Sequence, residues 1–269
     1  MAKNIGITCF SPTGTTRRIC NAVALGMGSE EPTVLDMTLP NNRAAIIANS
    51  STAMDGIDHL IVGAPVYVGK LPLQAQECLR TLRGNGKECT AIVVYGNRDY
   101  GTALHKMVEI LLENGFTVVA AGMFIGQHSV SDLIPVAVGR PDKSDIEKAI
   151  EFGVKVLGAS KHLSIKDVPV QIDMLSKSNS YWALKPSYYE EQCVPCGKCA
   201  EVCPLGLPSA DTGKYLSKAA EKQCLGCMAC VKSCTPRARA TKANPIVKMV
   251  LKRILRQAAR ERKEPFIIV

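Results

Sequence analysis

The chain lacks the usual marks of a membrane protein, a secreted protein and a nucleoside-triphosphate enzyme. No apolar run reaches the roughly 18 residues that a membrane-spanning helix needs. The first ten residues, MAKNIGITCF, enter a strand-like pattern at once, without a signal peptide's apolar stretch and cleavage site. We therefore expect a cytoplasmic protein. No GxxxxGK[ST] loop occurs, and no GxGxxG fingerprint of a dinucleotide site follows the first strand-like segment.

Aromatic residues are scarce, with five Phe, seven Tyr and one Trp, and charged residues make up only 21% of the chain. Hydrophobic residues make up 46% of the 269 residues, which is enough for a sizeable core and excludes bulk disorder. This length suggests two domains. Twelve cysteines are present. In a reducing compartment a disulfide framework is not expected, so the cysteines indicate metal binding or catalysis.

Charge and cysteine divide the chain into two parts. Residues 1–160 carry 14 Lys and Arg against 15 Asp and Glu, whereas residues 161–269 carry 19 against 9. Eight of the twelve cysteines fall between Cys193 and Cys234. The join has no clear period and contains Pro169, Pro186 and the run SKSNS. We predict four segments: a first domain at 1–160, a linker at 161–190, a cysteine-rich domain at 191–236 and a basic helical tail at 237–269.

Strand and helix patterns alternate in the first segment. Apolar runs between turn residues predict strands at residues 4–9, 33–36, 57–63, 89–95 and 117–125. Helical periods predict helices at residues 15–27, 42–48, 73–82, 102–113 and 144–157. Such alternation predicts an α/β fold, a doubly wound parallel sheet of five strands covered on both faces. Ligands of these folds bind at the carboxyl ends of the strands.

The loop after the first strand, Ser11-Pro12-Thr13-Gly14-Thr15-Thr16, leads directly into a helix. Hydroxyl groups, free backbone N–H groups and a helix N-terminus together make an anion cradle. Hydroxyls without a lysine suit a monophosphate. The alternative is a Ser/Thr-rich helix cap without a ligand.

The SPTGTT loop resembles the FMN-phosphate loop of flavodoxins, [ST]-x-T-G-x-T. The resemblance places the isoalloxazine ring between the loops after the third and fourth strands. Tyr67 and Tyr100 match the places of the aromatics that cover the ring, and Gly69 matches a glycine near flavin N5. The alternative is that Tyr67 and Tyr100 are ordinary loop tyrosines without a ligand. The implied FMN-binding residues are Ser11, Thr13, Gly14, Thr15, Thr16, Pro65, Val66, Tyr67, Val68, Gly69, Gly96, Asn97, Arg98, Asp99 and Tyr100.

The cysteine-rich segment repeats the spacing C-x2-C-x2-C-x3-C twice, which is the pattern of bacterial two-cluster ferredoxins. In that pattern the fourth cysteine of each run binds the other cluster. The resemblance implies a small α+β ferredoxin domain with two 4Fe–4S clusters. The first cluster set is Cys193, Cys196, Cys199 and Cys234. The second cluster set is Cys224, Cys227, Cys230 and Cys203.

A pair of structural zinc sites is the competing interpretation, because four thiolates also suit tetrahedral zinc. Zinc ribbons use two CxxC pairs rather than two runs of four cysteines, so we favour clusters. One departure from the ferredoxin pattern is Pro236, which stands one place later than Pro204 does in the first run. A module of this size cannot bury enough core to be stable alone, so we expect metal binding to stabilise it.

The basic tail shows a helical pattern over residues 245–262, with an apolar stripe and five basic side chains elsewhere. We expect the stripe to pack on the protein itself. Contact with a membrane surface or with an acidic partner is the alternative. No nucleic-acid motif accompanies the tail. The four histidines have no spaced partner; His128 follows the fifth strand, at the ligand end of the sheet.

As a whole, the chain resembles flavodoxin–ferredoxin fusion electron-transfer proteins of anaerobic bacteria and archaea. The resemblance extends to the segments VVYGNRDYG, GQHSVSD and PVAVGRPD. It implies electron transfer between two clusters and FMN, linking one-electron and two-electron redox partners, which we expect to have acidic docking surfaces. The rival is a flavin-dependent reductase of a quinone or nitro compound, although the sequence supplies no catalytic acid–base pair. A module docked on a membrane or larger complex through its tail is a third option.

Overall fold

The computed structural model describes residues 3–171 and 184–269 of the 269-residue chain. All five predicted strands form, and they make a parallel sheet in the order β2-β1-β3-β4-β5. This is the doubly wound order of flavodoxin-like folds. A sixth strand, which the sequence did not predict, pairs antiparallel with β5. The sheet strands are β1 (Ile5–Cys9), β2 (Thr33–Asp36), β3 (His59–Pro65), β4 (Glu88–Tyr95), β5 (Thr117–Ile125) and β8 (Phe266–Ile268).

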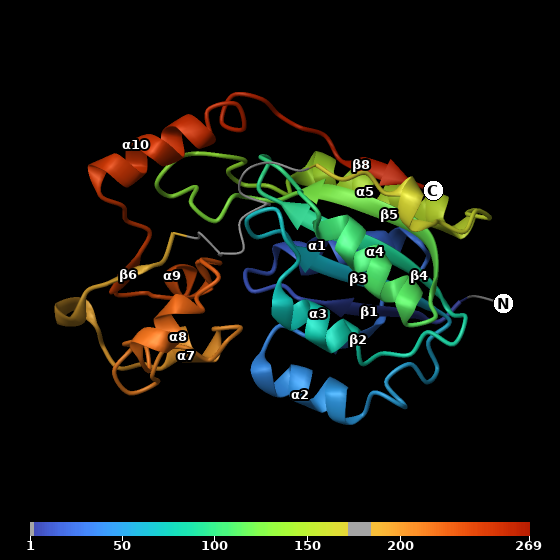
Figure 1. Ribbon diagram of the computed structural model, residues 1–269, viewed down its shortest axis with the longest axis horizontal. Coiled ribbons are helices and arrows are strands. Elements are labelled where there is room, and N and C mark those ends of the chain that lie inside the picture. Colours follow the sequence, from blue (N-terminus) through green and yellow to red (C-terminus); the bar gives the residue numbers. More distant parts are fainter. Residues whose placement is uncertain (1–2, 172–183) are drawn as a thin grey trace.

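Helices cover both faces of the sheet (Figure 1). One face carries α1 and α5, which pack against each other, and the other carries α3 and α4 with α2 beside them. Each face has its own apolar core, because the central strands are buried on both sides. The helices are α1 (Thr15–Gly26), α2 (Pro40–Ala48), α3 (Leu73–Leu79), α4 (Ala103–Glu113) and α5 (Lys143–Leu157).

Two glycines let α1 and α5 approach closely. A Cβ atom added to Gly153 of α5 would lie 2.1 Å from the carbonyl oxygen of Val23. One added to Gly26 of α1 would lie 2.0 Å from the carbonyl oxygen of Ile150. The two backbones are therefore in direct contact, which no larger residue permits at either position.

The cysteine-rich region, defined here as residues 184–240, lies beside the carboxyl edge of the sheet (Figure 1). Its elements are short: β6 (Ser187–Tyr188), η2 (Glu190–Gln192), α7 (Lys198–Glu201), α8 (Lys218–Lys222), α9 (Ala229–Lys232) and β7 (Arg239–Ala240). It contacts the sheet domain through Arg43, which donates a 2.7 Å hydrogen bond to the carbonyl of Pro204. Leu225 of this region is buried within the apolar core beside α3 and α4.

The predicted linker is described only in part. Residues 161–171 include a single 3₁₀ turn, η1 (Ile165–Asp167), and Leu163 and Val168 pack on the core. The SKSNS run and the rest of residues 172–183 lie outside the described residues.

The predicted tail helix is shorter than expected. Helix α10 (Pro245–Ile254) ends eight residues before the predicted limit of residue 262. A strap of residues 255–265 then runs along the loops at the carboxyl edge of the sheet and leads into β8 (Figure 1). In the part of the chain that the structure describes, no helix is both long and apolar enough to cross a membrane.

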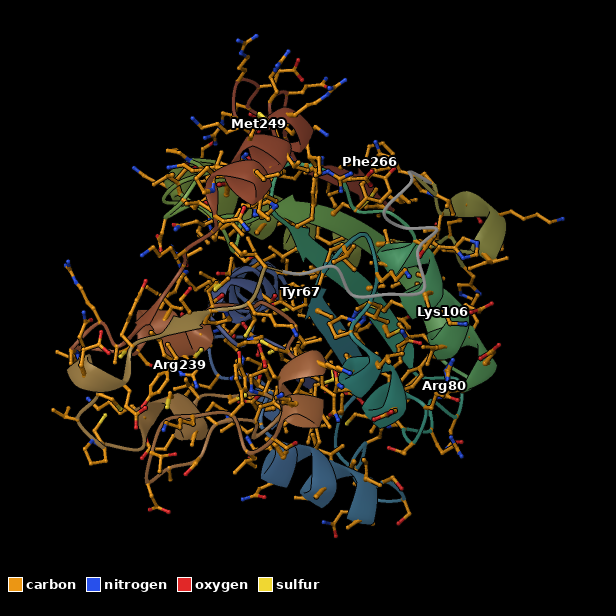
Figure 2. The ribbon with its side chains drawn as sticks, turned by 60° about the vertical axis from the view of Figure 1, so that its left-hand side comes forward. Tyr67, Arg80, Lys106, Arg239, Met249 and Phe266 are labelled. Carbon is orange, nitrogen blue, oxygen red and sulfur yellow. The ribbon has the colours of Figure 1, made fainter. Side chains whose placement is uncertain are left out.

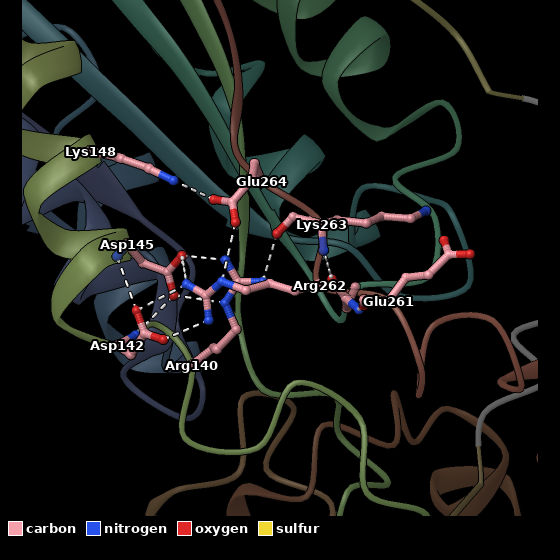
Figure 3. A network of polar contacts seen from close by, with 9 residues as sticks. Arg140, Asp142, Asp145, Lys148, Glu261, Arg262, Lys263 and Glu264 are labelled. Carbon is pink, nitrogen blue, oxygen red and sulfur yellow. Dashed lines mark hydrogen bonds and ion pairs between the residues drawn. The ribbon is translucent and has the colours of Figure 1, made fainter.

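Polar contacts fix the strap to α5 and to the loop before it (Figure 3). The guanidinium of Arg140 donates to both oxygens of the buried Asp145 and, at 2.8 Å, to the carbonyl of Lys263. Arg262 donates to both oxygens of Asp142 at 2.8 and 3.2 Å. These hydrogen bonds hold the pKa of the Asp142 carboxyl below its usual range. The end of the chain is thus an integral part of the sheet domain.

Candidate functional site

A cavity of about 770 Å³ lies at the carboxyl edge of the sheet, bounded by the sheet domain, the cysteine-rich region and α10. All but three of the predicted FMN-binding residues line it. The three that do not are Gly14, Asn97 and Tyr100. The lining set comprises Ser11, Thr13, Thr15, Thr16, Pro65, Val66, Tyr67, Val68, Gly69, Gly96, Arg98 and Asp99.

The first loop presents a helix N-terminus to this cavity. Gly14, at the N-cap of α1, has a φ of 77° and no side chain that can cap the helix. Ser11 supplies a cap, since its hydroxyl accepts a 3.0 Å hydrogen bond from the N–H of Arg17. The hydroxyls of Thr13 and Thr15 lie 3.2 Å apart and line the cavity. The loop combines two hydroxyls with the positive end of a 12-residue helix.

A tight turn carries Tyr67 along one wall. Tyr67 and Lys70 exchange backbone hydrogen bonds of 3.1 and 3.0 Å, and the two residues between them have positive φ angles. One of these is Val68, at a φ of 53°, where a β-branched residue is strained. Burial, with the nearby Cys227 and Cys224 sulfurs, raises the pKa of Tyr67 well above its usual range. Tyr67 is therefore a neutral phenol that lines the cavity, and it lies between the sheet domain and the cysteine-rich region (Figure 2).

Asn97 has another task than lining the cavity. Its amide nitrogen donates to the carbonyls of Ala258 and Glu261 at 2.7 and 2.6 Å, and its oxygen accepts from the N–H of Lys263 at 3.1 Å. Tyr100 packs edge-on against Tyr95, with ring centroids 5.9 Å apart. In this structure Asn97 anchors the strap, Tyr100 is partly buried against the core, and neither residue lines the cavity.

The loop after β5 adds four residues that were not in the predicted FMN-binding set, Gln127, His128, Ser129 and Val130. Gly96 makes room for the imidazole of His128, because a Cβ atom added to Gly96 would lie 2.6 Å from Cδ2 of that ring. Burial, with a smaller effect of Arg98, lowers the pKa of His128 to about 4. The ring is neutral at pH 7, and its Nδ1 accepts from the N–H of Val130 at 3.3 Å. One feature of the sequence indicated that His128 lies at the site: it follows the fifth predicted strand, at the end of the sheet where ligands bind.

The apolar stripe of α10 forms the wall opposite the sheet. Ile246, Val247, Val250, Leu251 and Ile254 of the helix line the cavity, as does Leu255 after it. No residue of α10 is buried, and Ile246 is 70% exposed. The expectation that the stripe packs on the protein is therefore wrong for most of the helix. It holds for Leu251, which is partly buried, and for Leu255 and Ala258, which are buried beside Val130, Ile134 and Met228.

Two smaller cavities lie within the cysteine-rich region, and each is lined by four cysteines. One is lined by Cys193, Cys196, Cys199 and Cys234, and the other by Cys203, Cys224, Cys227 and Cys230. Their membership equals the first and second cluster sets. Within residues 3–171 and 184–269, no three His, Cys, Asp or Glu side chains lie close enough to hold a single metal ion.

Cys227 and Leu225 line both the second of these cavities and the large cavity. The sulfur set of Cys224, Cys227 and Cys230 therefore lies directly beside the large cavity. The first set lies farther out, with Cys196 exposed to solvent. The distance between the large cavity and the cysteine-lined cavities could not be predicted from the sequence, because it depends on how the sheet domain and the cysteine-rich region pack together.

The other four cysteines lie in the sheet domain, and all of them are buried: Cys9, Cys20, Cys78 and Cys89. Burial raises the pKa of the Cys9 thiol to about 11, although Arg17 donates to its sulfur at 2.8 Å. Burial also raises the pKa of Cys78 to about 11. These residues are thiols at neutral pH and behave as small apolar side chains.

No protein-family model matches the chain, and no curated protein matches its sequence. Among solved structures, it is similar to a flavodoxin from the domain Archaea, at 17% identity over 57% of this chain and 96% of that one, with a TM-score of 0.41. It is also similar to oxidised flavodoxin 2 from Bacillus cereus, at 18% identity over 58% and 98% of the chains, with a TM-score of 0.43. A third is an apo NADH:FMN oxidoreductase, at 20% identity over 60% and 91%, with a TM-score of 0.43.

Proposed function

We propose that the chain is an electron-transfer protein that passes electrons between two 4Fe–4S clusters in the cysteine-rich region and FMN in the large cavity. When bound, the clusters supply one-electron carriers and the flavin supplies a two-electron carrier. The protein's own part is to hold these groups in contact, exclude water between them and present one of them to a partner.

The lining of the large cavity supports FMN. The N-terminus of α1 and the hydroxyls of Thr13 and Thr15 suit a phosphate monoester, since no side-chain cation is needed to bind it there. Tyr67 and the Val68-Gly69 turn offer a flat, half-apolar surface for an aromatic ring. Because the His128 imidazole is neutral, it adds no positive charge to that surface.

The chemistry of the donor sets supports four-iron clusters over zinc. Four thiolates around one zinc lie about 3.8 Å apart, because tetrahedral Zn–S bonds are about 2.3 Å long. A four-iron cluster spreads its four thiolates over separate irons, so they lie farther apart than around one ion. Among the described residues, no three potential ligands approach a single point closely enough for one ion, while four cysteines surround each small cavity.

The observation that carries the proposal is that Cys227 lines both the large cavity and the second small one. One ligand of the second cluster would therefore touch the flavin site without intervening protein. Because Cys196 is exposed, a first cluster held by this set would be the one nearest to solvent. We infer the order partner, first cluster, second cluster, flavin, or the reverse.

The partner in this proposal has an acidic docking surface. The last 109 residues carry 19 Lys and Arg against 9 Asp and Glu, so association with an anionic surface is steered by charge. Reduction by such a partner slows as salt is added. Equal rates at low and high ionic strength would contradict this part of the proposal.

The first experiment is an anaerobic preparation in which iron, sulfide and flavin are counted per chain. We expect about eight irons and one FMN. Thr13→Ala should lower flavin content or affinity without changing the iron count, whereas Thr52→Ala in an exposed loop should change neither. Eight irons without flavin in the wild type would refute the FMN site, and flavin without iron would refute the clusters.

The path is tested by rapid mixing with a one-electron donor. We expect the visible absorbance of the clusters to fall first and that of the flavin to follow at a rate independent of protein concentration. A flavin rate proportional to protein concentration would mean transfer between molecules and would contradict the contact at Cys227.

One observation favours a second candidate, a flavin-dependent reductase of a small acceptor. The aliphatic wall of α10 faces the cavity without being buried by protein side chains, so it offers an apolar surface opposite the ring site. A quinone or nitro compound would suit that surface. Saturable steady-state turnover that is weakened by Val250→Lys would support the reductase, and reduction without saturation would support the carrier.

A further inference from the structure

Arg239 places a positive charge inside the cysteine-rich region. This residue, the first of β7, is only 2% exposed (Figure 2). Its guanidinium carbon lies 5.4 Å from the ring centroid of Tyr188 and 4.9 Å from that of Tyr215. A guanidinium stays protonated in proteins, so this charge is permanent. Two aromatic faces stabilise it but do not neutralise it.

The hydrogen bonds of this cation are incomplete. Its Nη2 donates to the carbonyl of Gly213, while Nε and Nη1 make no hydrogen bond to an oxygen or nitrogen among the described residues and have the Cys199 sulfur nearby. Burying a charge with unmet donors is costly unless an anion compensates for it. The surroundings of Arg239 therefore call for negative charge close by.

The two cysteine sets are the groups that can provide it. Arg239 lines the same small cavity as Cys193 and Cys199, and its backbone N–H lies 3.4 Å from the sulfur of Cys234. On the other side, the hydroxyl of Tyr215 donates to the sulfur of Cys224 at 3.3 Å. The cation and its aromatic neighbours thus bridge the first and second sets.

We propose that Arg239 raises the reduction potentials of both clusters by holding a fixed positive charge between them; this rests on the clusters of the proposed function. Reduction of a cluster takes one electron from the donor and adds one negative charge, with no bond formed or broken. A nearby cation in a poorly hydrated interior stabilises that added charge. Both clusters feel it, because Arg239 lines the cavity of the first set and interacts electrostatically with Cys230 of the second.

The test is a potentiometric titration of the anaerobic full-length protein, with the reduced clusters followed by electron paramagnetic resonance. In Arg239→Gln we expect the equilibrium constant for reducing the first cluster to fall at least tenfold, which equals 59 mV for a one-electron couple. The potential of the second cluster should shift in the same direction. Arg237→Gln removes an equal charge from an exposed residue two positions away and should shift neither cluster.

Iron and sulfide counts separate the possible failures. A wild type without clusters refutes the proposed function, and this inference with it. An Arg239→Gln protein that keeps eight irons and wild-type potentials refutes the inference alone. Should Arg239→Gln lose iron, Arg239→Lys decides. Retained iron with potentials near the wild type supports the role of the charge, and lost iron shows that Arg239 acts through packing and overturns the inference.

Discussion

The sheet domain and the cysteine-rich region bury their side chains in different ways. The sheet domain has two apolar cores, one on each face, and helices of up to 15 residues. The helices of the cysteine-rich region are four or five residues long, and its largest fully buried side chain is the cation Arg239. Such short helices are not stable by themselves. The comparison teaches that packing holds one region together and that bound metal would hold the other.

The largest effect we expect is on removal of iron. Chelation under reducing conditions should expose the amides of residues 187–240 to hydrogen exchange while those of β1, β3 and β4 stay protected. Cys227→Ala should lose about half of the iron, since each cluster holds four. Cys89→Ala, in the core of the sheet domain, serves as the control with unchanged iron. Equal protection of both regions without iron would contradict the comparison.

The sheet domain should instead be destabilised by substitutions that disturb its packing. Gly153→Ala forces α1 and α5 apart, since the new Cβ would meet the carbonyl of Val23 at 2.1 Å. We expect a loss of about 2–4 kcal/mol in the free energy of unfolding, more than the roughly 1 kcal/mol that alanine gains in helix propensity. Urea denaturation followed by circular dichroism measures it.

The matched control is Gly158→Ala at the end of α5, where the nearest atom to the new Cβ lies 3.7 Å away. Its unfolding free energy should stay within about 0.5 kcal/mol of the wild type. If both variants lose the same stability, close contact of the helices is not the cause.

The strap between the two regions should be weakened next most strongly by Asn97→Ala. This change leaves the carbonyls of Ala258 and Glu261 without their donor, and residue 97 has a φ of 61°, where alanine is strained. We expect a loss of about 2–3 kcal/mol and faster hydrogen exchange over residues 255–265. Arg262→Gln, which removes half-exposed ion pairs, should cost at most about 1 kcal/mol. If Asn97→Ala and Arg262→Gln lose the same unfolding free energy, Asn97 has no special role in holding the strap.

The last effect concerns acid and is seen only when the pH is lowered. Burial lowers the pKa of His59 to about 4, despite its contact with Glu88, and that of His128 also to about 4. Between the ordinary histidine pKa of about 6.5 and pH 4 the unfolded chain binds more protons, so stability falls as the pH falls through this window. Each group contributes at most about 1.4 kcal/mol per pH unit.

His59 is the cleaner test, because its Nε2 lies 2.8 Å from the hydroxyl of Thr90 inside the sheet domain. His59→Gln should reduce the slope of unfolding free energy against pH between 5 and 6.5. A slope equal to that of the wild type would show that the imidazole is not held neutral.

The sequence predicted the sheet well because its strands are continuous apolar runs and its helices repeat at 3.6 residues. In α4, helical spacing puts Leu104, Met107, Val108, Leu111 and Leu112 on one face; the first four are buried and Leu112 is partly buried against the same core. The strand β8 has only three residues and depends on pairing with β5, a contact far away in the sequence. Local periodicity carries no signal of such a pairing.

The same reasoning explains the errors at the site. The helical period of the tail continues to residue 262, but Asn97 draws the carbonyls of Ala258 and Glu261 into hydrogen bonds with its amide. Helix α10 nevertheless ends at Ile254, before either residue, so these hydrogen bonds hold the strap that follows the helix. The position of Cys227 beside the large cavity also arises from packing between regions. Spacing within one run of cysteines specifies a ligand set but not its neighbours.

The pairing of β8 with β5 makes the cysteine-rich region an insertion rather than an appendage. Both ends of residues 184–254 are tied to the sheet domain, one through residues 161–171 and the other through the strap and β8. An insert closed at both ends explores far less space than a domain on a single tether, so its sulfur sets stay at a high effective concentration near the large cavity. If the proposed clusters were lost and later restored, the region would have only a short distance to search before it docked again.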